Sequence, residues 1–258
     1  MHSYFIRPVT AAAAAGAIVT TFGLASAGTA QAAARHGLVQ PVYATTQAGY
    51  LAGNGASNRF RFVTATFTVT SCSDPAASHG WTGNGVEIGA NSLAWTAAIS
   101  AGCDNGSGAP VSYQTVDAGH ANAPVPLSID PAAGTSLTMS IYYSRQTGLV
   151  YVTVTDNDTG DTDIRTHLVG GLAAYYGAEI RSVLGGTVSA PSASVRTALF
   201  SRCALTTYHG ARGSVLGRWP TSQIIATSTG LAGGTVIANA PVLWNGGRQF
   251  GVWERTTA

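Results

Sequence analysis

Short segments in which apolar and polar residues alternate recur along this chain, and no window keeps a helical period. The alternation is clearest over residues 136–143 and 149–155, while residues 60–69 are rich in β-branched and aromatic residues. Further strands are expected over residues 85–89, 93–99, 111–116, 164–169, 196–205, 223–227, 235–239 and 249–253. Short strands at even spacing predict an all-β fold, a β-sandwich of two antiparallel sheets.

The composition favours one extracellular domain. Charged residues make up only 9% of the 258 residues, and the chain contains arginine but no lysine. A formal net charge of +2 does not give the clustered basic surface that nucleic acid requires, so we expect no nucleic-acid partner. The 45% hydrophobic content supplies a core, and no internal repeat or low-complexity linker divides the body.

The N-terminus is typical of a secretion signal. Arg7 supplies a positive charge, residues 9–24 form an apolar run, and small residues at 30–32 and 32–34 fit an A-x-A cleavage site. The run is too short and too rich in alanine for a membrane anchor. We therefore predict a signal peptide over residues 1–34, a mature N-terminal segment over 35–48 and a sandwich domain over 49–258. The processed protein is expected to be secreted, monomeric and free of the membrane.

Three cysteines agree with an oxidising compartment. Cys72 and Cys103 flank a predicted hairpin at a separation that allows a bridge, which leaves Cys203 either buried or free. The six histidines are scattered, and no spacing of Cys and His indicates a metal site, so we expect neither metal nor cofactor. The aspartates of residues 156–161 invite a calcium interpretation. A hairpin turn is preferred, because the glycine offset and the closing glutamate of a calcium loop are missing.

Glu179 is the candidate functional residue that stands out. It is one of only three glutamates and lies in an apolar, strand-like run with Ile180 and Val183. A carboxylate on a half-buried strand is disfavoured unless it has a partner or a chemical task, and desolvation would raise its pKa toward the range useful for acid–base catalysis. The alternative is a solvent-facing residue paired with Arg181.

The order of several weak motifs resembles that of the glutamic peptidases, the eqolisins, and especially of their bacterial secreted relatives. These motifs are an Ala-Gly-Tyr start at residues 48–50, a strand leading to Thr-Ser-Cys at 70–72, a second strand before Ala-Gly-Cys at 101–103, Asp-Thr-Gly at 158–160 and Ala-Glu at 178–179. The resemblance covers residues 49–253. It implies a concanavalin-like β-sandwich, a curved double sheet whose concave face binds a peptide.

The family's chemistry is peptide hydrolysis by a glutamate and a glutamine. The resemblance gives Glu179 the role of general base on a water and then of general acid to the leaving amine, which favours low pH. The glutamine amide of the family stabilises the oxyanion. That glutamine is absent here, since residues 95–100 read Trp-Thr-Ala-Ala-Ile-Ser, and the nearest glutamines are Gln47 and Gln114. Thr96 offers a hydroxyl in this stretch, although it is shorter than an amide.

The surroundings of the catalytic glutamate also depart from the family pattern. Ile180 stands where a tryptophan usually follows the glutamate, and Glu87 lies on the strand that resembles the wall of the groove. A Glu87/Glu179 dyad would push one carboxyl pKa up, whereas the alternative for Glu87 is an exposed strand position. Trp81 and Trp95 are candidates for an aromatic wall that binds substrate, with a core or loop position as the alternative.

Three functions fit this sequence. The first is an exported hydrolase of peptides or proteins that resembles the glutamic peptidases and depends on Glu179. The second is a non-catalytic relative, a pseudoenzyme whose groove binds peptide or polysaccharide. The third is a lyase or glycosidase on a similar sandwich, but nothing in the spacing of Tyr113, His120 and Arg145 brings them together.

Overall fold

The computed structural model describes residues 38, 40–53, 59–69, 82–89, 96–103, 110–117, 125–129, 131–132, 134–169, 178–183, 198–213 and 219–254. Residues 110–117 and a few strand ends are described by their backbone alone. Every regular element in these residues is a strand, which confirms the all-β prediction. No helix long and apolar enough to cross a membrane occurs among the described residues.

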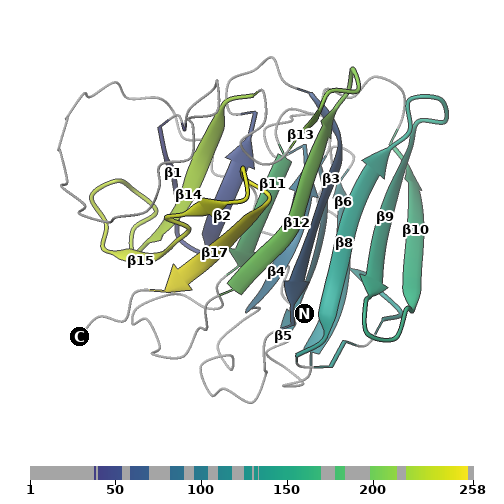
Figure 1. Ribbon diagram of the computed structural model, residues 1–258, viewed down its shortest axis with the longest axis horizontal. Helices are drawn as coiled ribbons and strands as arrows, with labels where there is room; N and C mark the ends of the chain where they lie inside the picture. Colours follow the sequence, from purple (N-terminus) through teal and green to yellow (C-terminus); the bar gives the residue numbers. More distant parts are fainter. Residues whose placement is uncertain are drawn as a thin grey trace.

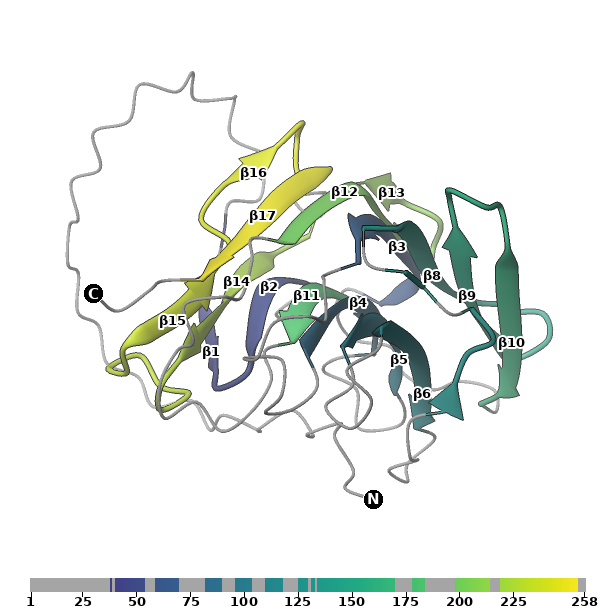
Figure 2. The same ribbon diagram turned by 90° about the horizontal axis from the view of Figure 1, so that it is seen from below.

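The strands form two layers, which Figure 2 shows lying one over the other. Sheet 1 runs in the order β1 (Val42–Ala44), β14 (Thr221–Thr227), β2 (Gln47–Ala52), β11 (Ala178–Val183), β4 (Thr82–Ile88), β5 (Thr96–Cys103), β6 (Pro110–Asp117) and β7 (Val125–Pro126), with β15 (Val236–Asn239) also beside β14. Sheet 2 runs in the order β10 (Thr162–Leu168), β9 (Leu149–Asp156), β8 (Ser136–Tyr143), β3 (Phe60–Thr68), β12 (Ala198–Thr207), β17 (Gln249–Glu254) and β16 (Leu243–Trp244), with β13 (Arg212–Gly213) also beside β12.

The described strands pair antiparallel except for β1, which pairs in parallel with β14 and places Tyr43 opposite Ile225. Upstream of β1, Leu38 adds an isolated parallel bridge to Thr221 of β14. β1 and the start of β2 precede residue 49, so the sheet extends into the range expected for the mature N-terminal segment. The alternation of apolar and polar residues indicates which face of a strand is buried, but not whether the strand runs parallel or antiparallel to its neighbour.

The core lies between the two sheets and follows the period-two pattern of the strands. Sheet 2 contributes rows of buried side chains from β3, β8 and β9, namely Val63, Ala65, Phe67, Leu137, Met139, Ile141, Val150, Val152 and Val154. Aromatic rings join the layers, since Tyr50 of β2 packs edge-on against Phe250 of β17 at 4.9 Å, and Phe250 stacks on Phe200 of β12 at 4.8 Å. One continuous apolar core therefore holds the sandwich together.

The two layers are joined differently along their two flanks. β17 pairs with β12 of sheet 2 and also with β15 of sheet 1, so a backbone ladder connects the layers on that side. On the opposite flank, Asp163 of β10 accepts hydrogen bonds from the backbone N–H and the hydroxyl of Ser128, at 2.6 and 2.7 Å. Ser128 is the second residue after the end of β7 of sheet 1.

The aspartate-rich segment between β9 and β10 is a hairpin turn, as the sequence favoured. The carboxylate of Asp156 accepts hydrogen bonds from the backbone N–H groups of Asp158 and Thr159, at 2.8 and 3.1 Å. Side chains of Asp that bond to their own backbone in this way stabilise turns without an ion. Within the described residues, no group of three His, Cys, Asp or Glu side chains is placed to hold a metal.

Candidate functional site

Glu179 lies in the middle of sheet 1, on β11 between β2 and β4 (Figure 1). Its neighbours Ala178 and Ile180 are buried in the core between the sheets. Because successive side chains of a strand point to opposite faces, Glu179 and Arg181 lie on the outer face of sheet 1. Both are nevertheless largely buried, with 9% and 7% of their surface exposed.

Glu87 lies directly beside Glu179. It is the register partner of Glu179 in the antiparallel pair of β4 and β11, and its neighbours Val86 and Ile88 point into the core. Side chains of residues directly opposite in such a pair stand next to each other on the same face. The structure therefore brings together the two glutamates of the predicted dyad, and Glu87 is buried rather than an exposed strand residue.

Arg181 bridges the two carboxylates. Its Nη1 lies 2.5 Å from Oε2 of Glu87 and donates a hydrogen bond to Oε2 of Glu179. The three side chains are only 8–12% exposed, and that of Glu179 is the most exposed of them. The pairing of Glu179 with Arg181 thus coexists with the dyad instead of replacing it. One guanidinium shared by two carboxylates leaves a net negative charge when both are ionised.

The surroundings of Glu87 raise the pKa of its carboxyl group. Burial is the main cause, the charge of Glu179 acts in the same direction, and the charge and hydrogen bond of Arg181 oppose both, so that the pKa rises from 4.5 to about 7. The two carboxylates also raise the pKa of Arg181, against the effect of its burial. Near neutral pH the cluster therefore holds a permanent cation beside a carboxyl group that can donate a proton.

Two glycines flank Arg181 in the neighbouring strands. Gly49 of β2 and Gly85 of β4 are its register partners. A Cβ atom on Gly49 would lie 2.7 Å from the Cα of Arg181, and a Cβ atom on Gly85 would lie 2.3 Å from the carbonyl oxygen of Ile99 and 2.7 Å from the Cβ of Ser100. Only glycine allows this close approach of the strands around the arginine.

Gly85→Ala is expected to lower the free energy of unfolding by about 1–3 kcal/mol, because the new methyl group meets backbone atoms that cannot move aside. Urea denaturation measures the change. Gly233→Ala is the matched control, since its Cβ meets nothing within 4 Å, and we expect a change below about 1 kcal/mol. Equal effects of the two substitutions would show that the spacing of β4 and β5 is not restricted.

Ser100 of β5 is the register partner of Gly85 on β4, which is in turn the register partner of Arg181 on β11. Its Oγ is buried and has no hydrogen-bond partner, which is uncommon for a buried hydroxyl. Sequence reasoning singled out Thr96 in this strand. The residue paired with Glu87 is Ala98, however, and Thr96 pairs with Asp117 one step beyond the end of β4. Ser100 could have been found by alternation from Glu87 once the register of the β4–β5 hairpin was known.

No glutamine occupies a position beside Glu179 in the described strands. The register partners of Glu179 are Leu51 and Glu87, and the next residues outward are Ser222 and Ala98. Gln47 lies on β2 four residues from Leu51, which corresponds to about 13 Å along a strand. Gln114 pairs with Ile99 on the far side of β5. The functional amide that the resemblance implied is thus absent from these positions.

The remaining predicted site residues are only partly covered by the structure. Trp81, Trp95 and Cys72 lie outside the described residues, and Cys103 is described by its backbone, which pairs with Thr82. The aromatic wall and the Cys72–Cys103 bridge stay predictions. Cys203 is buried and unpaired, and burial raises the pKa of its thiol to about 12, so that the reactive thiolate does not form near neutral pH.

Comparison with known proteins supports the fold. No known protein family and no curated protein matches the sequence. Among solved structures, the chain is similar to scytalido-glutamic peptidase in complexes with a peptide-based transition-state analogue and with a transition-state analogue inhibitor, at 14% identity in both and with TM-scores of 0.60 and 0.61. It is also similar to SCP-B, a member of the eqolisin family of peptidases, in complex with the tripeptide Ala-Ile-His, at 15% identity and a TM-score of 0.55. Each match covers 83% of this chain and all of the other.

Proposed function

We propose that this protein hydrolyses peptide bonds with Glu179 and Glu87 as a pair of acid–base groups. The observation that supports this function is the placement of two carboxyl groups side by side on the outer face of sheet 1, bridged by Arg181. Pairs of titratable groups in unequal environments are how enzymes obtain an acid and a base at one pH. The likeness in fold to peptidases that bind peptide-based inhibitors favours a peptide as the substrate.

In this proposal Glu179 is the general base and Glu87 the general acid. Glu179 takes a proton from a water molecule whose oxygen attacks the carbonyl carbon of the peptide. Glu87, which is kept protonated by its burial, gives its proton to the amide nitrogen as the C–N bond breaks. Glu179 then holds the proton of the water, and its return to Glu87 restores the starting state. The carboxyl side chain of Glu179 is the more exposed of the two, which suits the group that meets the water.

The oxyanion formed by this attack needs a donor, and the chain offers two in place of the missing glutamine. The hydroxyl of Ser100 is buried without a partner, and Arg181 keeps its charge at every working pH. A preorganised donor in a site with little water typically contributes about 10²–10³ in rate. Arg181 follows Glu179 by two residues on β11, and Ser100 follows the partner of Glu87 by two residues on β5. Both residues therefore occupy the next position along the same face of sheet 1.

A second function is binding of a peptide without cleavage. Arg181 favours this alternative, because it holds the carboxylate of Glu179 in a buried ion pair, and structural clusters contain such pairs as well as active sites. In that case Arg181 and the two carboxylates would form a structural cluster, and the same face of sheet 1 would bind peptide or polysaccharide.

The proposed function includes export of the protein from the cell. Residues 1–34 act as a signal peptide, the processed chain is secreted as a monomer, and a Cys72–Cys103 bridge stabilises the domain in an oxidising environment. The dyad requires no metal ion or organic cofactor.

The pH dependence of cleavage tests the proposed roles. We expect the native chain to cleave peptides of a mixed library below about pH 7 and to lose activity as the pH rises through that value, because Glu87 then loses the proton that it donates. Mass spectrometry of the library between pH 4 and pH 9 measures the profile. Glu87→Gln is expected to remove the activity that depends on this proton and to leave no alkaline limb near pH 7.

The outcomes separate the two functions. Binding of peptides without cleavage at any pH, by both the native chain and Glu87→Gln, would support the binding alternative. An alkaline limb that is unchanged in Glu87→Gln would assign the acid role to another group.

A further inference from the structure

A second site is suggested by a hollow on the outer face of sheet 2. It is open to solvent, has a volume of about 950 Å³, and is lined by residues of β3, β8, β12, β13 and β17 and of the turn between β16 and β17. The Glu179 cluster lies on the outer face of sheet 1, so the whole thickness of the sandwich separates the two places. The hollow is therefore not part of the proposed catalytic site.

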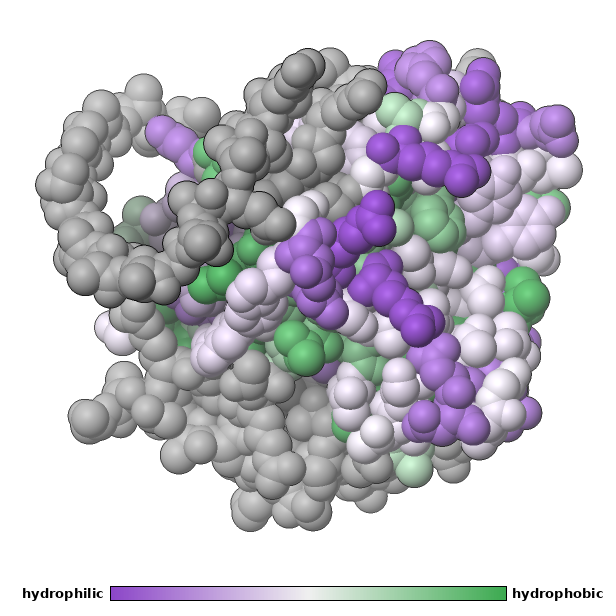
Figure 3. All heavy atoms as spheres, viewed as in Figure 1, coloured by the Kyte–Doolittle hydropathy of each residue, from purple (hydrophilic) through white to green (hydrophobic). Residues whose placement is uncertain are grey.

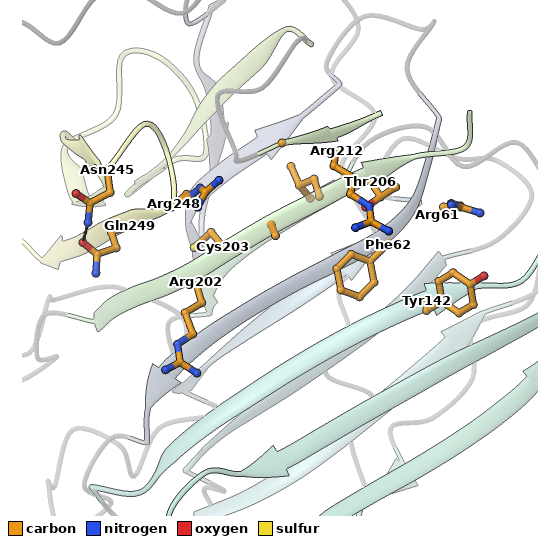
Figure 4. A pocket seen from close by; sticks show the side chains of 13 residues that line it. Arg61, Phe62, Tyr142, Arg202, Cys203, Thr206, Arg212, Asn245, Arg248 and Gln249 are labelled. Carbon is orange, nitrogen blue, oxygen red and sulfur yellow. Dashed lines mark hydrogen bonds between the residues drawn. The ribbon is translucent and has the colours of Figure 1, made fainter. Parts of the chain in front are cut away.

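Four arginines line this hollow, namely Arg61, Arg202, Arg212 and Arg248, and no carboxylate does. Figure 4 shows them at intervals around a patch of β3 and β12. Figure 3, which views the same face of the molecule as Figure 1, shows hydrophilic side chains gathered across its middle. None of these four arginines forms an ion pair with a described residue. The positive charge in the hollow is thus not neutralised by the described residues.

Two of these arginines lie at irregularities in the pairing of β3 with β12. The register shifts between Thr206 and Thr207, which leaves Arg61 as the extra residue of β3. It shifts again between Ser201 and Ala204, which leaves Arg202 and Cys203 opposite one residue of β3. β-bulges redirect side chains and are enriched beside functional sites. Here both bulges occur where an arginine lines the hollow.

The backbone at Arg202 is in an unusual conformation. Its φ is 52°, in the left-handed region that a side chain such as arginine rarely adopts. The next residue fixes this conformation, since the N–H of Cys203 donates a hydrogen bond of 3.0 Å to the carbonyl oxygen of Arg248. Such a conformation destabilises the backbone locally and is usually tolerated where it serves a function. Arg61 also lacks a hydrogen bond, because its Nε is buried and has no hydrogen-bond partner.

The rest of the lining combines flat apolar surface with side-chain amides. Phe62 is half-buried, Tyr142 is exposed, and its ring lies 6.0 Å from that of Tyr151. Asn245 donates a hydrogen bond to Gln249 at the other end of the hollow. A ligand of this surface would combine anionic groups, which guanidinium groups bind in pairs of hydrogen bonds, with apolar faces that pack on the rings.

We propose that this hollow binds an acidic polysaccharide, one that carries carboxylate or sulfate groups on its sugar rings. Peptides commonly bind to sheets by adding a strand to a free edge. The strands that cross the hollow offer no such edge, because β3 is paired with β8 and β12, and β12 is paired with β3, β17 and β13. Recognition here therefore depends on side chains, which suits sugar rings and their acidic groups.

Binding of defined oligosaccharides to the full chain tests this site. We expect a hexamer of galacturonic acid or a sulfated hexasaccharide to bind in isothermal titration calorimetry, and a neutral cellohexaose not to bind. The first two ligands distinguish carboxylate from sulfate recognition. Arg212→Gln combined with Arg248→Gln is expected to weaken binding about tenfold or more, since each removes a charge-assisted hydrogen bond. Arg202→Asn, which can keep the left-handed backbone, should weaken binding in the same direction.

A matched double variant controls for net charge. Arg145→Gln combined with Arg165→Gln also removes two charges, but both arginines are exposed outside the hollow. We expect this control to bind like the native chain. Equal losses in the two double variants would overturn the location of the site. Tighter binding of polyglutamate or of a single-stranded oligonucleotide than of either acidic hexasaccharide would overturn the class of ligand, and so would binding of inorganic sulfate alone. Peptide cleavage is measured in parallel and stays unchanged, so this test is independent of the proposed hydrolysis.

Discussion

Arg181→Met is expected to lower the free energy of unfolding by about 3–5 kcal/mol at pH 8, the usual loss when one partner of a buried ion pair is removed. Methionine has a similar volume and fills the space between Gly49 and Gly85, so the loss does not come from a cavity. It comes from Glu87 and Glu179, which are left side by side in a buried place without their shared cation. Urea denaturation at several pH values measures the effect.

The pH dependence of this loss follows from the titration of Glu87. In the native chain its pKa is raised to about 7, so its contribution to stability is present below its unfolded value near 4.5 and is lost as the pH rises to about 7. Without Arg181, which lowers this pKa, the decline continues to higher pH. The difference between variant and native chain is therefore larger at pH 8 than at pH 5.

Arg165→Met provides the comparison for Arg181→Met. Arg165 pairs with Asp163 at 2.8 Å, but 44% of its side chain is exposed, and exposed pairs contribute only about 0–1 kcal/mol. A loss at Arg181 as small as that at Arg165, or one that does not vary with pH, would show that the buried cluster does not carry the charges assigned to it.

Glu179→Gln is expected to lower the rate of peptide hydrolysis by about 10²–10⁴, the range for a general acid or base. The amide has the shape of the carboxylate and still accepts a hydrogen bond from Arg181, but it cannot take a proton from water. The measurement is kcat/KM on a peptide that the native chain cleaves, together with the thermal unfolding midpoint of both proteins to establish that the variant is folded.

Asp158→Asn is the matched control for Glu179→Gln. Asp158 lies in the exposed turn between β9 and β10, where its carboxylate accepts a hydrogen bond from the N–H of Ser136. The same change from carboxylate to amide there should leave hydrolysis unaltered. Equal activity of Glu179→Gln and the native chain would exclude Glu179 as the base, and the dyad would have to be assigned to binding.

Much of the fold could be predicted because the period-two pattern is strong where one face of a strand is buried. Residues 136–143 were expected as a strand, and β8 has the same bounds, with Leu137, Met139 and Ile141 in the core. Where the pattern is weaker, the predicted strand differs more, as for β5, which begins at Thr96 rather than at residue 93 and extends to Cys103. The two-sheet sandwich follows from these strands and needs no knowledge of their order.

The candidate site was less predictable, because it depends on register. Glu179 stood out as a carboxylate in an apolar run, and Glu87 was a candidate neighbour, but only the pairing of β11 with β4 places them side by side. The bridging position of Arg181 and the unpartnered hydroxyl of Ser100 depend on the same register. A shift by one residue would turn each of these side chains into the core, and no pattern within a single strand reports it.

The bulges at Arg61 and Arg202 were beyond sequence reasoning for a related reason. Each is defined by a mismatch in length between β3 and β12, which lie far apart in the chain. Residues 60–69 and 196–205 were both expected as strands, yet neither contains a glycine or proline to mark the irregularity.

The unequal joining of the two layers determines where the sandwich can open. Along β17 the layers share a strand, so parting them there means breaking a run of main-chain hydrogen bonds in concert. Along the flank of β10, the link that the described residues provide is the pair of hydrogen bonds from Ser128 to the side chain of Asp163. We therefore expect partial unfolding to begin at the flank of β10, where the hydrogen bonds between Ser128 and Asp163 break first. The flank of β17 should stay intact until the whole domain unfolds.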